Sequence, residues 1–166
     1  MTIRQDEITH EELKRLISYD PLTGKFVRRV TTGMKTHVGQ VVGTQGPRPR
    51  ISFNRRDYRA SRLAWFYVHG KWPDGVVDHI NGDPTDNRLE NLRDVSQRVN
   101  RENQRVASSY NKNSGLLGVR AGLRGKWDAV IHVKGKPIYI GRFATPEIAH
   151  AAYIAAKRVF HEGCTL

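Results

Sequence analysis

The chain has 166 residues and a formal net charge of +12, with 28 Lys and Arg against 16 Asp and Glu. Such an excess of positive charge indicates a polyanionic partner, with nucleic acid the first candidate and an anionic membrane surface the second. No apolar run approaches the ~20 residues that span a bilayer, and the first residues lack the plan of a signal peptide, so we expect an intracellular protein without a membrane partner. The single cysteine, Cys164, excludes an intrachain disulfide and a multi-cysteine zinc site.

The N-terminal part of the chain is expected to alternate short helices and strands. Thr9-His10-Glu11-Glu12 is typical of a capping box, and the helix it starts should end at Tyr19-Asp20, because Pro21 disfavours helical geometry in the residue before it. Ser61 is the expected cap of a second helix, which should stop at Gly70. Strands are predicted at 25–30, 41–42 and 50–54, with a hairpin turn at 54–57.

Six arginines make the region around this hairpin densely cationic, and Arg55 and Arg56 lie at its predicted turn. A run of charge is usually a solvated face, which is one interpretation. Next to the stretch 76–103, whose chemistry is described below, the arginine cluster favours phosphate contact instead. Arg55 and Arg56 are therefore DNA-binding candidates.

The stretch 76–103 carries the chemistry. Asp78-His79 places a carboxylate beside an imidazole at the end of a short apolar run, and a loop rich in Asn, Asp and Gly follows. A second short apolar run then leads to a helix capped by Ser96, which bears Asn100. With an ordinary pKa of ~6.5, histidine suits a general base. Asp78 is a credible ligand for Mg²⁺, which prefers oxygen donors and keeps several waters.

Two features of this stretch leave alternatives open. Adjacent strand residues point to opposite faces, so a bulge or a strained strand end would be needed to aim Asp78 and His79 at one phosphate. A lone Asp-His pair is also more often structural than catalytic.

Asn103, one helical turn after Asn100, is a reserve ligand. Four loop residues are better explained as turn formers than as ligands: Asn81, Asp83, Asp86 and Asn87.

The ordered set Asp78-His79, Asn91-Leu92 and Asn100 resembles the HNH endonucleases, over about residues 20–103. It is closest to the homing and phage-type branch, where a preceding helix like Ser61-Arg62-Leu63-Ala64-Trp65 is common and Asn often replaces the last His. The resemblance implies a two-stranded hairpin and helix that grip one divalent metal, Mg²⁺ or else Mn²⁺, and not zinc. It implies that His79 is the general base, that Asp78 and Asn100 bind the metal, and that Asn91 holds the loop and orients His79.

From residue 115 the pattern changes to Gly-punctuated strands at 118–120, 126–133 and 138–143. A helix follows, with Thr145 as cap and Pro146 in its first position. Alternation in the middle strand predicts a sheet with one apolar face, on which the helix packs, and one polar, cationic face. The helix residues expected to face the sheet are Ala149, Ala152, Ala156 and Val159, flanked by Ile148, Tyr153 and Phe160.

These strands and the Ala-rich helix resemble the plant ethylene-response-factor DNA-binding domain, over about residues 115–161. That family reads the major groove of double-stranded DNA with its sheet. Gly122 and Val130 depart from it, because the plant proteins carry Arg and Glu there, so target specificity does not transfer. A merely solvated sheet is the alternative. The resemblance implies DNA contacts from Arg120, Arg124, His132 and Tyr139, and Lys126, Lys134 and Arg142 are predicted phosphate anchors.

The sequence thus predicts an α+β chain with a nuclease domain at 1–103, whose catalytic unit is at about 76–103. A linker at 104–114 and a sheet-and-helix DNA-binding domain at 115–166 complete it. The predicted function is a metal-dependent DNA endonuclease in the cytoplasm, on the nucleoid or in a phage-infected host. One site per chain suggests nicking, or double-strand cutting by two chains, and the oligomeric state is left open. The alternatives are an inactive DNA-binding regulator and an RNA-binding or RNA-processing protein.

Overall fold

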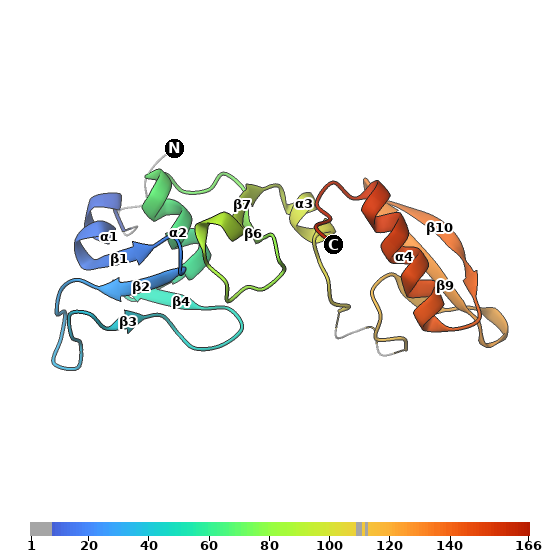
Figure 1. Cartoon of the computed structure of the whole chain (residues 1–166), viewed down its shortest axis with the longest axis horizontal. Coiled ribbons are helices and arrows are strands. Elements are labelled where there is room, and N and C mark those ends of the chain that lie inside the picture. Colours follow the sequence, from blue (N-terminus) through green and yellow to red (C-terminus); the bar gives the residue numbers. More distant parts are fainter. Residues whose placement is uncertain (1–7, 109–110, 112) are drawn as a thin grey trace. The chain divides into compact units, whose positions relative to one another are not determined.

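The computed structural model describes residues 8–108, 111 and 113–166. The chain divides into two compact units, Met1–Val95 and Ser96–Leu166 (Figure 1). Over the described residues it is an α+β protein with four α-helices and several small antiparallel sheets. None of the helices in these ranges is long and apolar enough to cross a membrane.

The first unit contains one three-stranded sheet, of order β1-β2-β3, and two hairpins, β4–β5 and β6–β7. Neighbouring strands are antiparallel throughout. Its elements are α1 (His10–Leu16), β1 (Ile17–Asp20), β2 (Lys25–Arg28), β3 (Val41–Val42), β4 (Arg50–Phe53), β5 (Arg56–Arg59), α2 (Ala60–His69), β6 (Val76–His79), the short 3-10 helix η1 (Leu89–Asn91) and β7 (Leu92–Val95).

The predicted cap of α1 is confirmed, because the Thr9 side chain accepts a hydrogen bond from Glu12 N. Its predicted end at Tyr19-Asp20 is wrong. The helix stops at Leu16, because residues 17–20 pair with residues 25–28 as antiparallel strands. This long-range pairing overrides the local helical pattern.

The predicted cap of α2 is also wrong. The helix begins at Ala60, and Ser61 is buried inside its first turn. Ala60 N donates to Pro49 O at 3.0 Å, so a carbonyl from the preceding hairpin satisfies a helix-start amide that a side-chain cap would otherwise bind. The predicted stop is confirmed, since Gly70 ends the helix in the left-handed conformation.

The hydrophobic core of the first unit holds the β6–β7 hairpin in place. Leu63, Ala64 and Phe66 of α2 are buried there together with Val77 of β6 and Leu92 of β7. At the open end of the hairpin, the Asp94 carboxylate accepts from Asp74 N and Gly75 N, at 2.8 and 2.9 Å. The hairpin is therefore fixed both by apolar packing and by hydrogen bonds from backbone amides to the Asp94 side chain.

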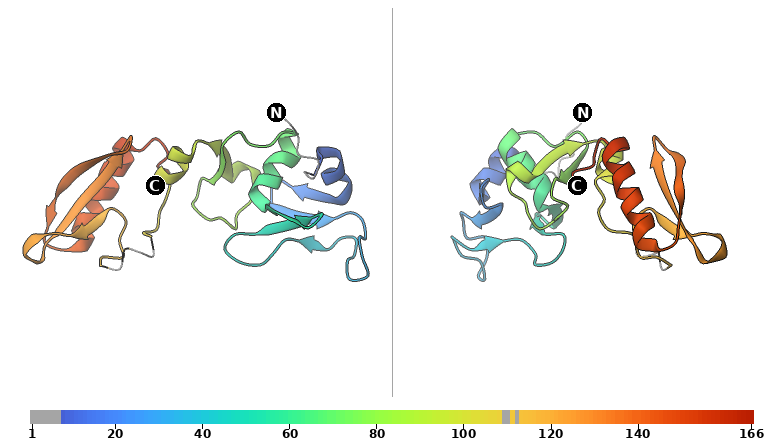
Figure 2. Two further views of the ribbon diagram at one scale, coloured as in Figure 1. Left: turned by 180° about the vertical axis from the view of Figure 1, so that it is seen from behind. Right: turned by 45° about the vertical axis from the view of Figure 1, so that its right-hand side comes forward.

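The second unit is built on a three-stranded antiparallel sheet of order β10-β9-β8. Helix α4 lies along one face of this sheet (Figures 1 and 2). Its elements are α3 (Gln97–Glu102), β8 (Val119–Ala121), the short 3-10 helix η2 (Leu123–Gly125), β9 (Trp127–Val133), β10 (Lys136–Phe143) and α4 (Pro146–Phe160). The three strands and the Thr145 cap of α4 agree with the sequence prediction.

The buried face of α4 differs in part from the predicted stripe. Ala149 and Tyr153 are buried, as expected, and Lys157 continues the same row at i+4 spacing. Val159 is 77% exposed, and Ile148 and Phe160 are also exposed. The row through Ala149 and Tyr153 faces the sheet because Gly118 lets the Tyr153 ring pack directly against its backbone. A Cβ on residue 118 would lie 2.0 Å from Tyr153 Cδ2. The last residues of the predicted stripe therefore turn to solvent.

Helix α3 belongs to the second unit because the C-terminal tail, residues 161–166, is bonded to it. Glu102 accepts from Arg98 Nη1 at 2.7 Å and from Gly163 N at 3.1 Å. Arg98 also donates to Glu162, at 2.7 Å. At Gly163 a Cβ would lie 2.1 Å from Val99 O, so only glycine allows this close approach.

The described residues of the predicted linker, 104–114, form neither helix nor strand. The ammonium group of buried Lys157 donates to Gln104 O, so the start of this segment is bonded to α4. Tyr110 and Lys112, which belong to the predicted linker, lie outside the described residues. The predicted domain limits at 103 and 115 stay predictions.

Candidate active site

Asp78 and His79 end strand β6, and each faces a residue of β7. Asp78 pairs with Arg93 and His79 with Leu92, in unbroken register from Val76 onward. Side chains alternate along a regular strand, so the carboxylate and the imidazole leave the hairpin on opposite faces. This register contains no bulge, so of the two features that the sequence argument allowed, only the end of the strand at His79 is left to aim both groups at one phosphate.

The Asp78 carboxylate is 6% exposed and forms an ion pair with the facing arginine. Arg93 donates to Asp78 Oδ2 from Nε at 2.9 Å, and its Nη2 lies 2.8 Å from the same oxygen. A buried carboxylate needs such a partner, because an uncompensated buried charge costs several kcal/mol. The sequence argument did not identify Arg93.

His79 has an amide partner that the sequence argument treated only as a turn former. Its Nε2 lies 3.3 Å from Asn87 Oδ1. Asn87 Nδ2 donates to Thr85 O, which directs the amide oxygen toward the ring. Because a carbonyl oxygen can only accept, Nε2 carries a proton in this contact, and in the neutral ring the lone pair then lies on Nδ1. That tautomer has the form of a base.

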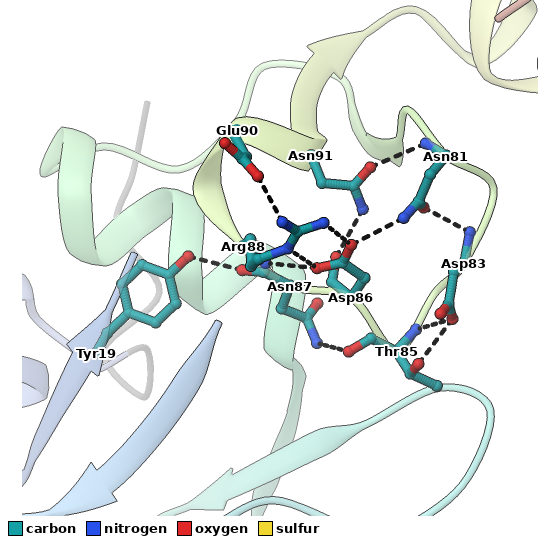
Figure 3. Close-up of polar contacts among 9 residues, drawn as sticks. All are labelled: Tyr19, Asn81, Asp83, Thr85, Asp86, Asn87, Arg88, Glu90 and Asn91. Atoms are coloured by element: carbon teal, nitrogen blue, oxygen red, sulfur yellow. Dashed lines mark hydrogen bonds and ion pairs between the residues drawn. The ribbon is translucent and has the colours of Figure 1, made fainter. Parts of the chain in front are cut away.

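The position of Asn87 is fixed from the first sheet. Tyr19 donates its hydroxyl proton to Asn87 O at 2.7 Å, and both residues are buried (Figure 3). Burial raises the pKa of Tyr19, with smaller contributions from Asp20 and Asp86, so the phenol remains a donor at neutral pH. The peptide between Asn87 and Arg88 also lies against Gly24, where a Cβ would be 2.6 Å from Arg88 N.

Asn91 ties the two limbs of the loop between β6 and β7 together (Figure 3). Its Oδ1 accepts from Asn81 N at 2.9 Å, and its Nδ2 donates to Asp86 O at 2.8 Å. The backbone carbonyl of Asn91 also accepts from Ile80 N, directly after His79. These contacts correspond to the loop-holding part of its predicted role. The amide group placed against His79 is that of Asn87.

The acidic residues of the loop bind other loop groups. Arg88 donates to both oxygens of Asp86, at 2.9 and 2.8 Å, and these bonds lower the pKa of Asp86 to about 2. Asp83 accepts from Thr85 N and from the Thr85 hydroxyl, at 2.9 and 2.7 Å. The loop carboxylates therefore act as turn formers, as the sequence indicated (Figure 3).

The remaining predicted ligands lie on or next to α3, in the second unit. Asn100 is on this helix, which Ser96 caps by accepting from Val99 N at 3.3 Å. The reserve candidate Asn103 is buried and accepts from the Thr165 hydroxyl at 2.5 Å. Within the described ranges, no group of three or more His, Cys, Asp or Glu side chains is placed to hold a metal ion. A metal site that uses the Asp78 carboxylate would therefore need amide oxygens as its other protein ligands.

The predicted DNA contacts are mostly exposed cations. Arg55 is exposed at the tip of the β4–β5 hairpin, where Asn54 and Arg55 both have positive φ, at 48° and 62°. Arg56 is half-buried. In the second unit the exposed candidates are Arg120, Arg124, Lys126, His132, Lys134, Tyr139 and Arg142.

Arg142 forms an ion pair on the polar sheet face. It donates to the two oxygens of Asp128 from Nε and Nη2, at 2.7 and 3.1 Å. These bonds lower the pKa of the Asp128 carboxyl, and the charge of Arg120 adds to the effect. A Cβ at Gly122 would lie 2.8 Å from Asp128 Oδ1, so the glycine that departs from the plant pattern leaves room for this pair.

Residues 58–102 match the family model described as HNH endonuclease. No curated protein and no solved structure matches the chain significantly. The matched segment runs from β5 to the end of α3 and includes Asp78, His79, Asn91 and Asn100. It supports an HNH nuclease unit, a kind of hydrolase that acts on nucleic acid. The match does not reach residues 115–161, so the second resemblance has no support from it.

Proposed function

We propose that the chain is a metal-dependent DNA endonuclease of the homing or phage type, directed to its target by the second unit. The observation that carries the proposal is His79, which lies inside the HNH match and whose Nε2 is held by the Asn87 amide oxygen. An imidazole whose Nε2 donates to an amide oxygen of the polar loop is oriented by that bond, which supports a general-base role for the ring.

The proposed chemistry starts at His79 Nδ1. This nitrogen takes a proton from a water molecule, whose oxygen bonds to phosphorus while the P–O3′ bond breaks and the departing 3′ oxygen takes up a proton from solvent. The products would be 3′-hydroxyl and 5′-phosphate ends. Asn91 and Asn87 would act before the chemical step, by fixing the loop and the ring orientation respectively.

Asp78 and Asn100 are the proposed metal ligands, and their donor chemistry fits a hard divalent cation. Carboxylate and amide oxygens suit Mg²⁺, which keeps several waters and so needs few protein ligands. A carboxylate has about four lone-pair sites, so Asp78 can retain its bonds to Arg93 and still bind a cation. When bound, the metal would stabilise negative charge on the scissile phosphate and the leaving oxygen.

The exposed cations of the second unit support a nucleic acid as the proposed substrate. The polar sheet face, opposite the face that packs on α4, carries Arg120 and His132, and Lys134 is exposed in the turn that follows β9. Exposed basic groups bind phosphate in either DNA or RNA, so the choice of DNA rests on the resemblance of residues 115–161 to a reader of the major groove.

Supercoiled plasmid tests the proposal directly. Incubation with Mg²⁺ or Mn²⁺ should convert it to nicked or linear forms, and EDTA should prevent the conversion. Plasmid that stays intact at every protein concentration, while a duplex still binds, would instead support the inactive regulator. Competition between duplex DNA and structured RNA at matched salt identifies the preferred nucleic acid, because salt sets the affinity of any polyanion.

Asn87→Ala should lower the cleavage rate by about 10- to 100-fold, because an unfixed imidazole spends less time in the reactive orientation. DNA affinity should be unchanged, since Asn87 is buried. Asn87→Asp keeps an oxygen acceptor for Nε2 but loses the donor to Thr85 O, and should have an intermediate rate. Single-turnover cleavage, with thermal unfolding as the folding check, measures both. Wild-type cleavage by a folded Asn87→Ala protein would exclude the positioning role.

A further inference from the structure

The second unit contains a cavity of about 590 Å³ that the site described above does not use. One wall is α3, and the others come from residues 117–120, from β9 and from α4. Its volume lies in the range of about 300–1,000 Å³ that is usual for ligand sites. The wall formed by α3 is held by the C-terminal tail through Glu102 and Arg98, so the cavity is preformed.

The lining combines exposed cations with apolar side chains. Arg101, Arg120 and Lys134 line it and are exposed, and the structure shows no ion pair for any of the three within its described residues. The carboxylate that also lines it, Glu102, is compensated by Arg98. Apolar surface comes chiefly from Leu117, Val119, Val130 and Tyr153.

This combination selects for an anion with apolar surface of its own. Free inorganic phosphate would use the cations and leave the apolar side chains of the lining unused. A nucleic acid strand presents a phosphate and an adjacent sugar or base in each nucleotide, and so matches both parts of the lining.

We propose that this cavity binds the phosphodiester backbone of one DNA strand, with Arg101 and Lys134 on phosphates. The proposal takes DNA as substrate from the proposed function and adds a site and a residue, Arg101. Arg120 and Lys134 belong to the predicted reading surface, and Arg101 follows Asn100 on α3. Helix α3 would then carry both a predicted metal ligand and a strand contact, and the strand would pass from the sheet to this helix.

The test is the salt dependence of duplex binding by the full chain, in EDTA so that no cleavage occurs. Fluorescence anisotropy of a labelled duplex should give a log K against log salt slope about 0.9 less steep for Arg101→Gln, and likewise for Lys134→Gln, because each loses one phosphate contact. Arg158→Gln is the matched control. Arg158 is an exposed arginine on α4 outside the cavity, so its slope should stay as in the wild type.

Two results would overturn the inference. Arg101→Gln could show the wild-type slope and affinity with an unchanged unfolding temperature. Alternatively, chemical shifts of the lining residues could show that a mononucleotide or inorganic phosphate saturates the cavity while duplex binding is not weakened. Either result leaves the nuclease proposal intact, because plasmid cleavage is measured separately. Conversely, a chain that binds duplex with the predicted slopes but never cuts would refute only the nuclease.

Discussion

His79→Ala should lower the rate of DNA cleavage by about 10²- to 10⁴-fold, the usual contribution of a general base. Alanine removes the only group proposed to take a proton from the attacking water. The affinity for duplex DNA should stay near the wild-type value, because the predicted binding cations lie elsewhere. The measurements are single-turnover cleavage of plasmid in Mg²⁺ and duplex binding in EDTA.

The control for this variant is His37→Ala. His37 is an exposed histidine of the same unit and has no side-chain contact among those that define the candidate site. Its replacement should leave both cleavage and binding unchanged. Cleavage by His79→Ala at the wild-type rate would show that another group takes the proton, and the base would then have to be reassigned.

Local chemistry explains which parts of the fold the sequence could predict. Thr9, Ser96 and Thr145 were predicted as helix caps because a cap bonds an amide only three residues away. The errors at residues 17–20 and at Ser61 have the opposite cause. There, a partner from a distant segment decided the structure: strand β2 in the first case and Pro49 O in the second.

The same distinction applies to the site. The residue types of Asp78 and His79 suggested a metal ligand and a base, and the resemblance to the HNH endonucleases suggested the role of Asn91. Arg93 could also have been found, because pairing His79 with Leu92 places Arg93 opposite Asp78 by register alone. Asn87 could not, since its contact with His79 depends on how a loop folds against Tyr19.

Contacts of the second unit follow this rule too. Alternation and register place Asp128 between Arg120 and Arg142 on the polar face, so their electrostatic coupling was accessible from sequence. The bond between Glu102 and Gly163 N was not, because neither residue belongs to a pattern that predicts the other. That bond nevertheless assigns α3, and with it Asn100, to the same compact unit as the sheet.

Asp78→Asn should abolish metal-dependent cleavage and weaken Mn²⁺ binding by about 100-fold or more, since loss of even an outer-shell partner typically costs 10- to 100-fold in metal affinity. The change keeps the shape of the side chain and removes its charge. It also deprives Arg93 of its ion pair, so some loss of stability is expected. Isothermal titration with Mn²⁺, beside thermal unfolding, separates the two effects.

Arg93→Gln provides the decisive comparison, because it breaks the same ion pair from the other side. If Asp78 binds the metal, removing the competing guanidinium should leave Mn²⁺ affinity equal to the wild type or higher. If Asp78 serves only the ion pair, the two variants should lose stability to a similar extent and neither should change metal binding. A loss of metal affinity in Asp78→Asn but not in Arg93→Gln, at similar losses of stability, is what a ligand role for Asp78 requires.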